Sequence, residues 1–301
     1  MKNSLRIALL PSAFLVLFGI SAAIASAATL SVSSSAIPQG GTTVLAVTPT
    51  YPGGVISVTG FVGSRAVSFF LSGGKWLGFY SAPAKAVPGT YRARVLVNGK
   101  YPLVSTVVIK DARFPVTKLV VTEELQSQGY TPTSIAGNIA GDDNASLLAS
   151  SAHPVPGALF TAAFRYPLEG ITGSGTTMNV GAFGNYRVSG GVKLQHLGTD
   201  LDAATGTPVY AVNDGVVTMA KLLSNYGNSI VIDHGGRIFS IYMHLDRATI
   251  AAGERVTKGQ VIGYSGNTGY SIAPHLHLSM WVNGTSIDPL AFIAATRAIM
   301  K

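Results

Sequence analysis

The chain of 301 residues contains no cysteine and few charged side chains. Without cysteine it can form no disulfide and carry no lipid on a cysteine, so the fold must depend on core packing alone. Charged residues make up only 11% of the chain against 47% hydrophobic ones, and there are 35 glycines. This composition is typical of a protein rich in β-strands and turns rather than a helical or disordered one. No basic patch with interleaved aromatic residues occurs, which argues against nucleic acid as a partner.

Long hydrophobic runs are also missing, except near the start of the chain. Residues 1–27 begin with a short positive region containing Lys2 and Arg6, continue with an apolar run and end in the small residues 25–27. This layout predicts a secretory signal peptide with cleavage after Ala27, the alternative being a retained N-terminal anchor. Without Lys2 and Arg6 the formal charge falls from +8 to +6, with 19 basic against 13 acidic residues. A modest basic excess suits an anionic wall or membrane surface.

Residues 28–111 break into short runs rich in valine, threonine, phenylalanine and tyrosine, separated by glycine, proline, serine and asparagine. Within 91–97 apolar residues alternate with Arg92 and Arg94, as in a half-buried strand. About six or seven such strands predict an antiparallel β-sandwich. The turn at Pro88-Gly89-Thr90-Tyr91 resembles turns of bacterial immunoglobulin-like domains. Because the region carries no catalytic cluster, we interpret it as a spacer or folding partner rather than a specific carbohydrate-binding domain.

Residues 112–160 differ in composition and predict a linker with short helices. The stretch 134–151 is rich in alanine, asparagine and serine, with Asp142 or Asp143 as a helix start signal, and 114–122 is expected to add a strand. The segment 153–157 contains two prolines and a glycine, which indicates an irregular connection in which His153 lies at the surface.

Residues 161–295 alternate between expected strands and turns, and predict an antiparallel β-sheet domain with an open groove. No convincing amphipathic helical period occurs before residues 289–298. The predicted fold class is therefore mainly β, with an N-terminal immunoglobulin-like β-sandwich followed by this second β domain. The expected strands are Val209–Ala211, Val216–Leu222, Ser229–Asp233, Ile238–His244 and Leu276–Val282.

The segment 274–281 predicts a β-strand that carries two histidines. Residues two apart in a strand point to the same face, so His275 and His277 project side by side while Leu276 and Leu278 face the other way. Two imidazoles held this close can share a metal ion, or one can bind it while the other handles protons. The alternative is a pair of polar residues on the solvated face of an antiparallel strand.

Histidine is concentrated in the second half of the chain, which points to a metal site. His196 and Asp200 are four residues apart, and an extended segment would bring both to one face, while Gly198 between them would allow the chain to bend toward a metal. Imidazole and carboxylate together suit Zn²⁺. Adding one histidine of the 275/277 pair gives three protein ligands and leaves a fourth tetrahedral position for water, as in a catalytic zinc site. The histidines of this half are His196, His234, His244, His275 and His277.

These residues belong to a longer series of short motifs that follow one another along the chain. The motifs are His196-x-Gly-x-Asp200, Gly206-Thr-Pro-Val-x-Ala211, Asp214-Gly-Val-Val217, Tyr226-Gly-Asn228, Asp233-His-Gly235, Tyr242-Met-His-Leu245, Gly253…Val256…Gly259-Gln260, Gly263…Gly266-Asn-Thr-Gly269 and Pro274-His-Leu-His277. The series runs from about Phe183 to Pro289 and resembles the lysostaphin/LytM-type zinc metallopeptidases, which cut peptide cross-links or stem peptides in bacterial peptidoglycan.

The resemblance implies that His196, Asp200 and His277 bind one Zn²⁺ per chain, and that His244 and His275 are the two other histidines of the site. Histidines must then transfer the protons, because none of the four glutamates is one of the residues named in these motifs. His275, beside the ligand His277, is the candidate general base. His244 would orient the water or stabilise the tetrahedral intermediate, although these two roles can be exchanged.

Other residues of the motif series are expected to act around the site. We interpret His234 as structural, and Tyr226 and Asn228 as residues that shape a loop at the groove. Asp202 is expected either to hydrogen-bond a metal ligand or to be exposed. Residues 266–270 are expected to form a groove wall or an ordinary hairpin turn.

The resemblance implies a secreted zinc-dependent endopeptidase that hydrolyses peptide bonds in peptidoglycan, with a metal-activated water as nucleophile. The expected partner is the peptidoglycan peptide, and the expected location is the periplasm, cell wall or extracellular space, without an integral membrane span after signal cleavage. The alternative is a non-catalytic wall-binding regulator, or an activator of other cell-wall hydrolases, on the same fold. Because all five metal and proton groups are present, we favour the enzyme.

Overall fold

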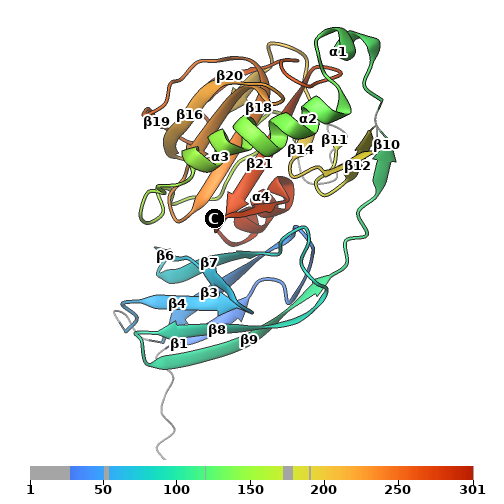
Figure 1. The fold of residues 1–301 in the computed structure, drawn as a ribbon. Coiled ribbons are helices and arrows are strands. Elements are labelled where there is room, and N and C mark those ends of the chain that lie inside the picture. The colour runs from blue at the N-terminus through green and yellow to red at the C-terminus, as the bar shows by residue number, and fades with distance from the viewer. Residues whose placement is uncertain (1–27, 51–53, 119, 172–178, 190, 301) are drawn as a thin grey trace, which may run out of the picture.

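The computed structural model describes residues 28–50, 54–118, 120–171, 179–189 and 191–300. The chain is mainly β, as predicted, and consists of a sandwich with a larger β-sheet assembly stacked on it (Figure 1). The predicted signal peptide, residues 1–27, lies outside the described residues. None of the helices within the described ranges has the length and hydrophobicity needed to cross a membrane.

Two sheets form the sandwich of residues 28–110, one in the order β1-β3-β7-β6 and the other β2-β9-β8-β4-β5. Their neighbours are antiparallel except for β2 and β9, which are parallel. The predicted number of strands was too low, because tight turns with glycines at positive φ divide residues 58–81 into several short strands. The strands are β1 Ala28–Val32, β2 Ala36–Pro38, β3 Thr42–Pro49, β4 Val58–Val62, β5 Arg65–Val67, β6 Phe69–Ser72, β7 Lys75–Ser81, β8 Gly89–Val97 and β9 Tyr101–Lys110.

Strands β3 and β7 are buried on both faces. Leu45 and Tyr80 join the core between the two sheets of the sandwich. Val44 and Phe79, one position away, point to the other face and belong to the core of the larger assembly. The four-stranded sheet is therefore the middle layer of three, which explains why its two long strands are hydrophobic at consecutive positions instead of alternating.

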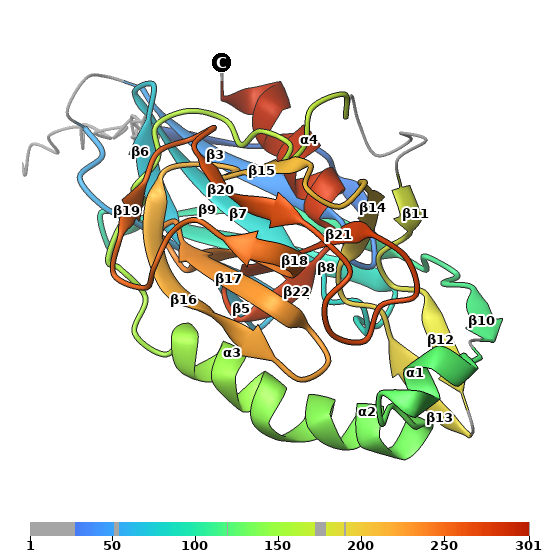
Figure 2. The same cartoon turned by 90° about the horizontal axis from the view of Figure 1, so that it is seen from above.

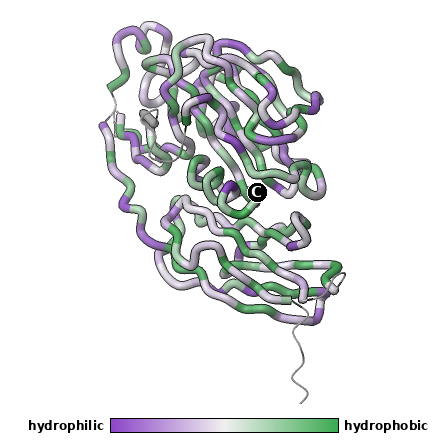
Figure 3. Tube along the Cα trace, turned by 180° about the vertical axis from the view of Figure 1, so that it is seen from behind, coloured by the Kyte–Doolittle hydropathy of each residue, from purple (hydrophilic) through white to green (hydrophobic). Residues whose placement is uncertain are grey.

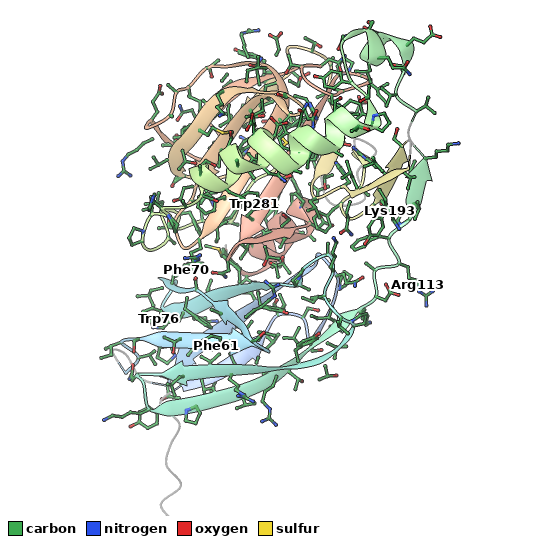
Figure 4. All side chains as sticks on the ribbon, in the orientation of Figure 1. Phe61, Phe70, Trp76, Arg113, Lys193 and Trp281 are labelled. Carbon is green, nitrogen blue, oxygen red and sulfur yellow. The ribbon has the colours of Figure 1, made fainter. Side chains whose placement is uncertain are left out.

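Phenylalanines from distant parts of the chain fill the junction between the sandwich and the larger assembly. The ring of Phe79 lies 5.2 Å from that of Phe292, which belongs to α4 (Pro289–Ile299). Phe70, on the side of the sandwich that faces the larger assembly (Figure 4), lies 5.0 Å from Phe160. Close aromatic pairs add to the free energy of burial. The two parts therefore share one continuous hydrophobic core.

The segment that joins the two parts contains the predicted short helices, here α1 (Glu123–Ser127), α2 (Pro132–Asn138), the π-helical turn η1 (Ile139–Asp143) and α3 (Asn144–Ser150). From α2 to α3 the chain is one kinked helical run along one side of the large sheet (Figures 1 and 2). The side chain of Asp143 makes no capping hydrogen bond at the start of α3, contrary to one of the two predicted start signals. Its carboxylate accepts hydrogen bonds from the backbone N–H groups of Ser224 and Asn225, at 2.9 and 2.8 Å.

The larger assembly is built on a ten-stranded sheet whose main order is β11-β14-β21-β18-β17-β16-β19. Its strands are β11 Asn179–Gly181, β14 Thr199–Asp202, β15 Pro208–Tyr210, β16 Gly215–Leu223, β17 Gly227–Asp233, β18 Ile238–Ala248, β19 Arg255–Val256, β20 Val261–Ser265, β21 His275–Val282 and β22 Thr285–Ile287. The five strands expected from the sequence correspond to β15, β16, β17, β18 and β21. A separate small sheet contains β10 (Val116–Lys118), β12 (Tyr186–Ser189) and β13 (Val192–Gln195).

The two faces of the large sheet have different partners. Tyr242, Leu276 and Leu278 are fully buried in the core shared with α4 and the sandwich. On the opposite face, Met243 belongs to a smaller cluster that Leu147 of α3 completes. Hydrophobic segments accordingly run through the interior strands of both parts of the molecule (Figure 3).

His234 is fully buried and anchored by hydrogen bonds, as expected for a structural residue. Its Nδ1 lies 2.7 Å from the backbone oxygen of Asp214, so Nδ1 must carry the proton and donate it. Its Nε2 is left as an acceptor for the hydroxyl of Ser240, at 2.8 Å, which in turn lies 3.0 Å from the hydroxyl of Tyr242. Burial lowers the pKa of His234 to about 4, so the ring is neutral at physiological pH.

We expect Phe79→Ala to destabilise the whole protein by about 3–5 kcal/mol, because it leaves a cavity in the shared core. Phe61→Ala is the matched control, since Phe61 is 49% exposed on the outer sheet and should change stability little. The chain has two tryptophans, Trp76 in the sandwich and Trp281 in the large sheet. Fluorescence of variants that retain one or the other would report each part separately during urea unfolding. Separate transitions for the two parts would contradict a shared core.

We also expect His234 to make stability depend on pH. The unfolded residue takes up a proton near pH 6.5, whereas the folded one does so only near pH 4. The unfolded state therefore binds more protons within this window, and stability falls as the pH is lowered through it, by about 2 kcal/mol at pH 5. His234→Gln should flatten this dependence in urea titrations, while the exposed-site variant His153→Gln should not. Parallel pH profiles for the wild type and His234→Gln would overturn this role.

Candidate metal centre

The predicted metal-binding residues come together on neighbouring strands of the large sheet. β14 and β21 are antiparallel, and their register places Asp200 directly opposite His277. His196 follows the end of β13 and points toward the same pair. One potential ligand atom from each of His196, Asp200 and His277 lies within 4.8 Å of the others, and all three residues are buried. The spacing of four residues and the strand alternation thus bring together the three side chains predicted as ligands.

The hydrogen bonds around these side chains determine which ring nitrogens are free. His196 Nδ1 lies 2.9 Å from the backbone oxygen of Ala182, so it donates, and Nε2 keeps its lone pair. His277 Nε2 lies 2.9 Å from Ser279 Oγ, which itself donates to the backbone oxygen of Leu197. Ser279 must therefore accept from His277 Nε2, which leaves the lone pair on His277 Nδ1.

Three electron-pair donors consequently face one another. His196 Nε2 lies 3.0 Å from both Asp200 Oδ1 and His277 Nδ1, and the last two atoms are 2.7 Å apart. Burial lowers the pKa of His277 to about 4. A carboxylate and two neutral imidazole nitrogens this close repel one another unless a cation lies between them, and this donor set suits Zn²⁺.

The residue midway between His196 and Asp200 must be glycine. A Cβ added to Gly198 would collide with the imidazole of His277 and lie 2.6 Å from Ser279 Oγ. The sequence had indicated Gly198 as a point where the chain could bend. The structure adds a steric reason, because the backbone passes directly against the third predicted ligand.

No sequence pattern indicated Arg187, which contacts the site from β12 in the small sheet. Its Nη2 lies 2.5 Å from Asp200 Oδ2, the oxygen that does not face the histidines. The guanidinium therefore holds the carboxylate in a fixed orientation, with Oδ1 directed toward His196 and His277. Arg187 was missed because only the register of the hairpin β12–β13 brings it to Asp200, and no local spacing indicates that contact.

His275 and His244 stand beside the three acceptors. His275 Nδ1 donates to the backbone oxygen of Ala273 at 2.8 Å, and its Nε2 lies 3.6 Å from Asp200 Oδ1. Burial opposes protonation of His275, but the hydrogen bond and charge of Asp200 outweigh it and raise the pKa. The ring centres of His275 and His244 are 4.8 Å apart. Both rings therefore belong to the same cluster, as the sequence predicted.

His244 reaches the cluster through an unusual backbone conformation. It has a positive φ of 60°, which is strained for a residue with a side chain. Regular alternation would place it on the opposite face from Met243, which pairs with His277 across the sheet. The left-handed turn brings the imidazole back to the face of His277. Its Nδ1 donates to the backbone oxygen of Thr268 at 2.8 Å, which leaves Nε2 unprotonated in the neutral ring, and burial lowers the pKa to about 3.

A cavity of about 230 Å³ adjoins the cluster. His196, His244 and His277 line it on the side of the large sheet, together with Tyr270 and Trp281. Ile135 of α2 and Leu147 of α3 line the other side, so the helical run forms a wall of the groove. The wall is fastened by the carboxylate of Asp143 to the loop at 224–225.

The remaining candidates lie around the site rather than within it. Asn228 donates to the backbone oxygen of Asp246 at 2.8 Å and Tyr226 to the side chain of Asn144 at 3.1 Å, which agrees with the expected role in shaping a loop. Tyr270, at the end of the expected wall 266–270, lines the cavity. Asp202 and His153 are exposed, and His234 is buried in the core away from the cavity lining.

Part of the chain is similar to a known protein family. Residues 194–289 match the model of Peptidase family M23. Peptidoglycan DD-endopeptidase ShyA of Vibrio cholerae serotype O1 is 42% identical over 95 residues, which are 32% of this chain and 22% of that protein. Glycyl-glycine endopeptidase ALE-1 of Staphylococcus capitis is 42% identical over 105 residues, 33% of this chain and 29% of that protein. The chain thus spans less than a third of these relatives.

One solved structure resembles nearly the whole described fold. A putative peptidase M23 from Pseudomonas aeruginosa aligns with a TM-score of 0.60 and covers 85% of this chain and 95% of its own. Its sequence identity is only 21%, so the likeness concerns the fold. The fold of most of this chain therefore occurs in another protein.

We expect Arg187→Gln to weaken zinc binding about 10–100-fold, because Asp200 loses the contact that orients it. Arg187→Lys should restore part of the affinity through its charge. Lys193→Gln removes the same charge from the same small sheet without touching Asp200, and should bind zinc like the wild type. Titration against a competing chelator measures the dissociation constant of each variant. Unchanged or tighter binding by Arg187→Gln would rule out an orienting role.

Proposed function

We propose that the protein is an exported zinc-dependent endopeptidase that hydrolyses peptide bonds in bacterial peptidoglycan, and the match of residues 194–289 to the model of Peptidase family M23 supports this proposal. The observation that carries the proposal is the group of three facing acceptors on His196, Asp200 and His277. Two further histidines, His244 and His275, stand next to them. A metal-activated hydrolase needs both sets of groups, and a purely structural metal site would not need the second.

The substrate class rests on the relatives. ShyA is named a peptidoglycan DD-endopeptidase and ALE-1 a glycyl-glycine endopeptidase, and both match the segment that carries the cluster. We propose that this chain acts on the peptide part of the same polymer, in its cross-links or its stem peptides. The hydroxyl- and aromatic-lined cavity beside the histidines is where an extended peptide would lie.

Different residues would bind the metal and transfer the protons. His196, Asp200 and His277 would hold the zinc, which supplies Lewis-acid activation of water and of the scissile carbonyl. In their neutral rings His275 and His244 both carry the proton on Nδ1, bonded to a backbone oxygen, and have Nε2 available as a base. One of them would accept the proton of the attacking water and return it to the leaving amine, while the other, protonated on Nε2, would stabilise the charge that develops on the carbonyl oxygen.

Export is part of the proposal. It rests on the layout of residues 1–27, with a positive start, an apolar run and a small-residue cleavage site. It also agrees with a substrate that lies outside the cytoplasmic membrane. We accordingly place the mature protein in the periplasm, the cell wall or the extracellular space.

Digestion of purified peptidoglycan tests the function, with mass spectrometry of the soluble products. The zinc-loaded wild type should release fragments that have gained one water per broken peptide bond. His277→Ala should lose zinc and activity together, because it removes a ligand. His275→Ala should keep its zinc and lose at least about 10²–10⁴-fold in rate, because it removes a proton-transfer group. Elemental analysis gives the zinc content of each protein.

His153→Ala is the matched control, since His153 is exposed and remote from the cavity lining. It should leave both zinc content and cleavage unchanged. A zinc-loaded wild type that yields no products from peptidoglycans of several cross-link types would overturn the endopeptidase and favour a non-catalytic wall regulator. Loss of zinc from His275→Ala with retention by His277→Ala would reverse the assigned roles.

A further inference from the structure

A second cavity, of about 260 Å³, lies at the C-terminal end of α4 and is separate from the metal centre. Phe164 and Met300 in its lining belong to the core on the face of the large sheet that is opposite to the metal centre. None of its lining residues contributes to the cavity beside the histidines. The residues that line it are Ala163, Phe164, Arg165, Lys258, Arg297 and Met300.

The three basic side chains of this cavity come from separate segments and are held in place by specific contacts. The guanidinium of Arg165 lies over the ring of Tyr210, at 4.4 Å from its centre. That of Arg297 lies over the ring of Tyr166, at 5.3 Å. Lys258 Nζ donates to the backbone oxygen of Ala163 at 2.5 Å. Stacking and hydrogen bonding thus fix three cations around one hollow.

Among the described residues, no acidic side chain lines the cavity to balance these charges. Glu169 pairs with Arg165 Nη2 at 2.7 Å, but its side chain is 74% exposed, so water screens the pair. Asp214 accepts a hydrogen bond from the backbone N–H of Lys258 at 2.7 Å, outside the lining. Partial burial and the charges of Arg297 and Arg165 lower the pKa of Lys258, whereas Asp214 opposes this effect. The three cations therefore repel one another, and an anion placed between them would relieve that repulsion.

Several hydrogen-bond donors of this cluster remain available. Arg165 uses Nε for the backbone oxygen of Tyr166 and Nη2 for Glu169. Its Nη1 lies over Gly259, where an added Cβ would come within 2.9 Å of it. Lys258 has three N–H donors and uses one of them for the backbone oxygen of Ala163. Arg297 has five N–H donors. A planar carboxylate has two oxygens for these donors, whereas a tetrahedral phosphate offers three or four in different directions.

We propose that the cavity formed by Arg165, Lys258 and Arg297 is a binding site for a phosphate group. The site is independent of the function proposed above, because it shares no residue with the metal centre. Its volume suits inorganic phosphate or the phosphate of a small headgroup, and not a large organic ligand. The two sources have the same binding chemistry and differ in what is attached to the phosphate.

Isothermal titration with inorganic phosphate tests the site in the full chain. The double variant Arg165→Gln/Arg297→Gln should bind phosphate at least about tenfold more weakly than the wild type, because it loses charge-assisted hydrogen bonds. The matched control is Arg92→Gln/Arg94→Gln, which removes two exposed arginines from the outer face of β8. The titration is run with and without zinc, since phosphate bound at the metal centre would be lost without zinc and phosphate bound at this cavity would remain.

Arg297→Gln alone provides a second variant, because within the part of the chain that the structure describes Arg297 packs on the face of Tyr166 and forms no ion pair. It should weaken phosphate binding while retaining the unfolding transition of the wild type. Equal phosphate affinity for the wild type and both cavity variants would overturn the site. Acetate binding as tightly as phosphate would overturn the assignment of ligand chemistry.

Sedimentation with lipid vesicles separates the two sources of phosphate. If the occupant is a headgroup, the wild type should bind vesicles of phosphatidylglycerol more strongly than the double variant, and more strongly than vesicles of phosphatidylcholine. If the occupant is free phosphate, vesicle binding should be equal for the wild type and the double variant, with the difference confined to the titration. Either pattern supports the site when the double variant also binds phosphate more weakly in the titration, and equal phosphate affinity contradicts it whatever the vesicles show.

Discussion

Three unprotonated acceptor atoms lie close together at the metal centre, and the surrounding structure must hold them there. Asp200 Oδ1, His196 Nε2 and His277 Nδ1 lie within 3.0 Å of their neighbours, a geometry that costs free energy without a cation. Each is held there by a contact on its outer side, from Ala182, Ser279 or Arg187. The site therefore depends on a rigid sheet behind it, because small shifts of any strand would release the contacts.

The large sheet provides this rigidity by being buried on both faces. One face packs against α4 and the middle sheet of the sandwich, in a core that includes Phe79 and Phe292. The other face carries the histidines and is covered in part by α2 and α3. The sandwich is therefore a structural layer of the domain that carries the site, which agrees with its interpretation as a folding partner.

Much of the site was predictable because strand geometry is local. Alternation on β21 put His275 and His277 on one face, and the interval from His196 to Asp200 brought the other two groups together, as found. The number of sandwich strands was underestimated, since three-residue strands have too few residues to show alternation. Asp142 or Asp143 was predicted as a helix start signal, but the carboxylate of Asp143 accepts hydrogen bonds from backbone N–H groups about eighty residues away in the sequence.

The sequence by itself determined the kinds of donor atoms and their order, because ligand chemistry and the period of a strand are properties of neighbouring residues. Tertiary structure alone decided that Arg187 orients Asp200 and that three cations lie together at the end of α4. It also decided that the side chain of His244 lies on the face of the sheet that carries His277. These features depend on register between hairpins, on a single left-handed backbone conformation and on packing of remote segments. None of the three leaves a periodic or spacing signal in the chain, since each arises only when separate elements are brought into contact.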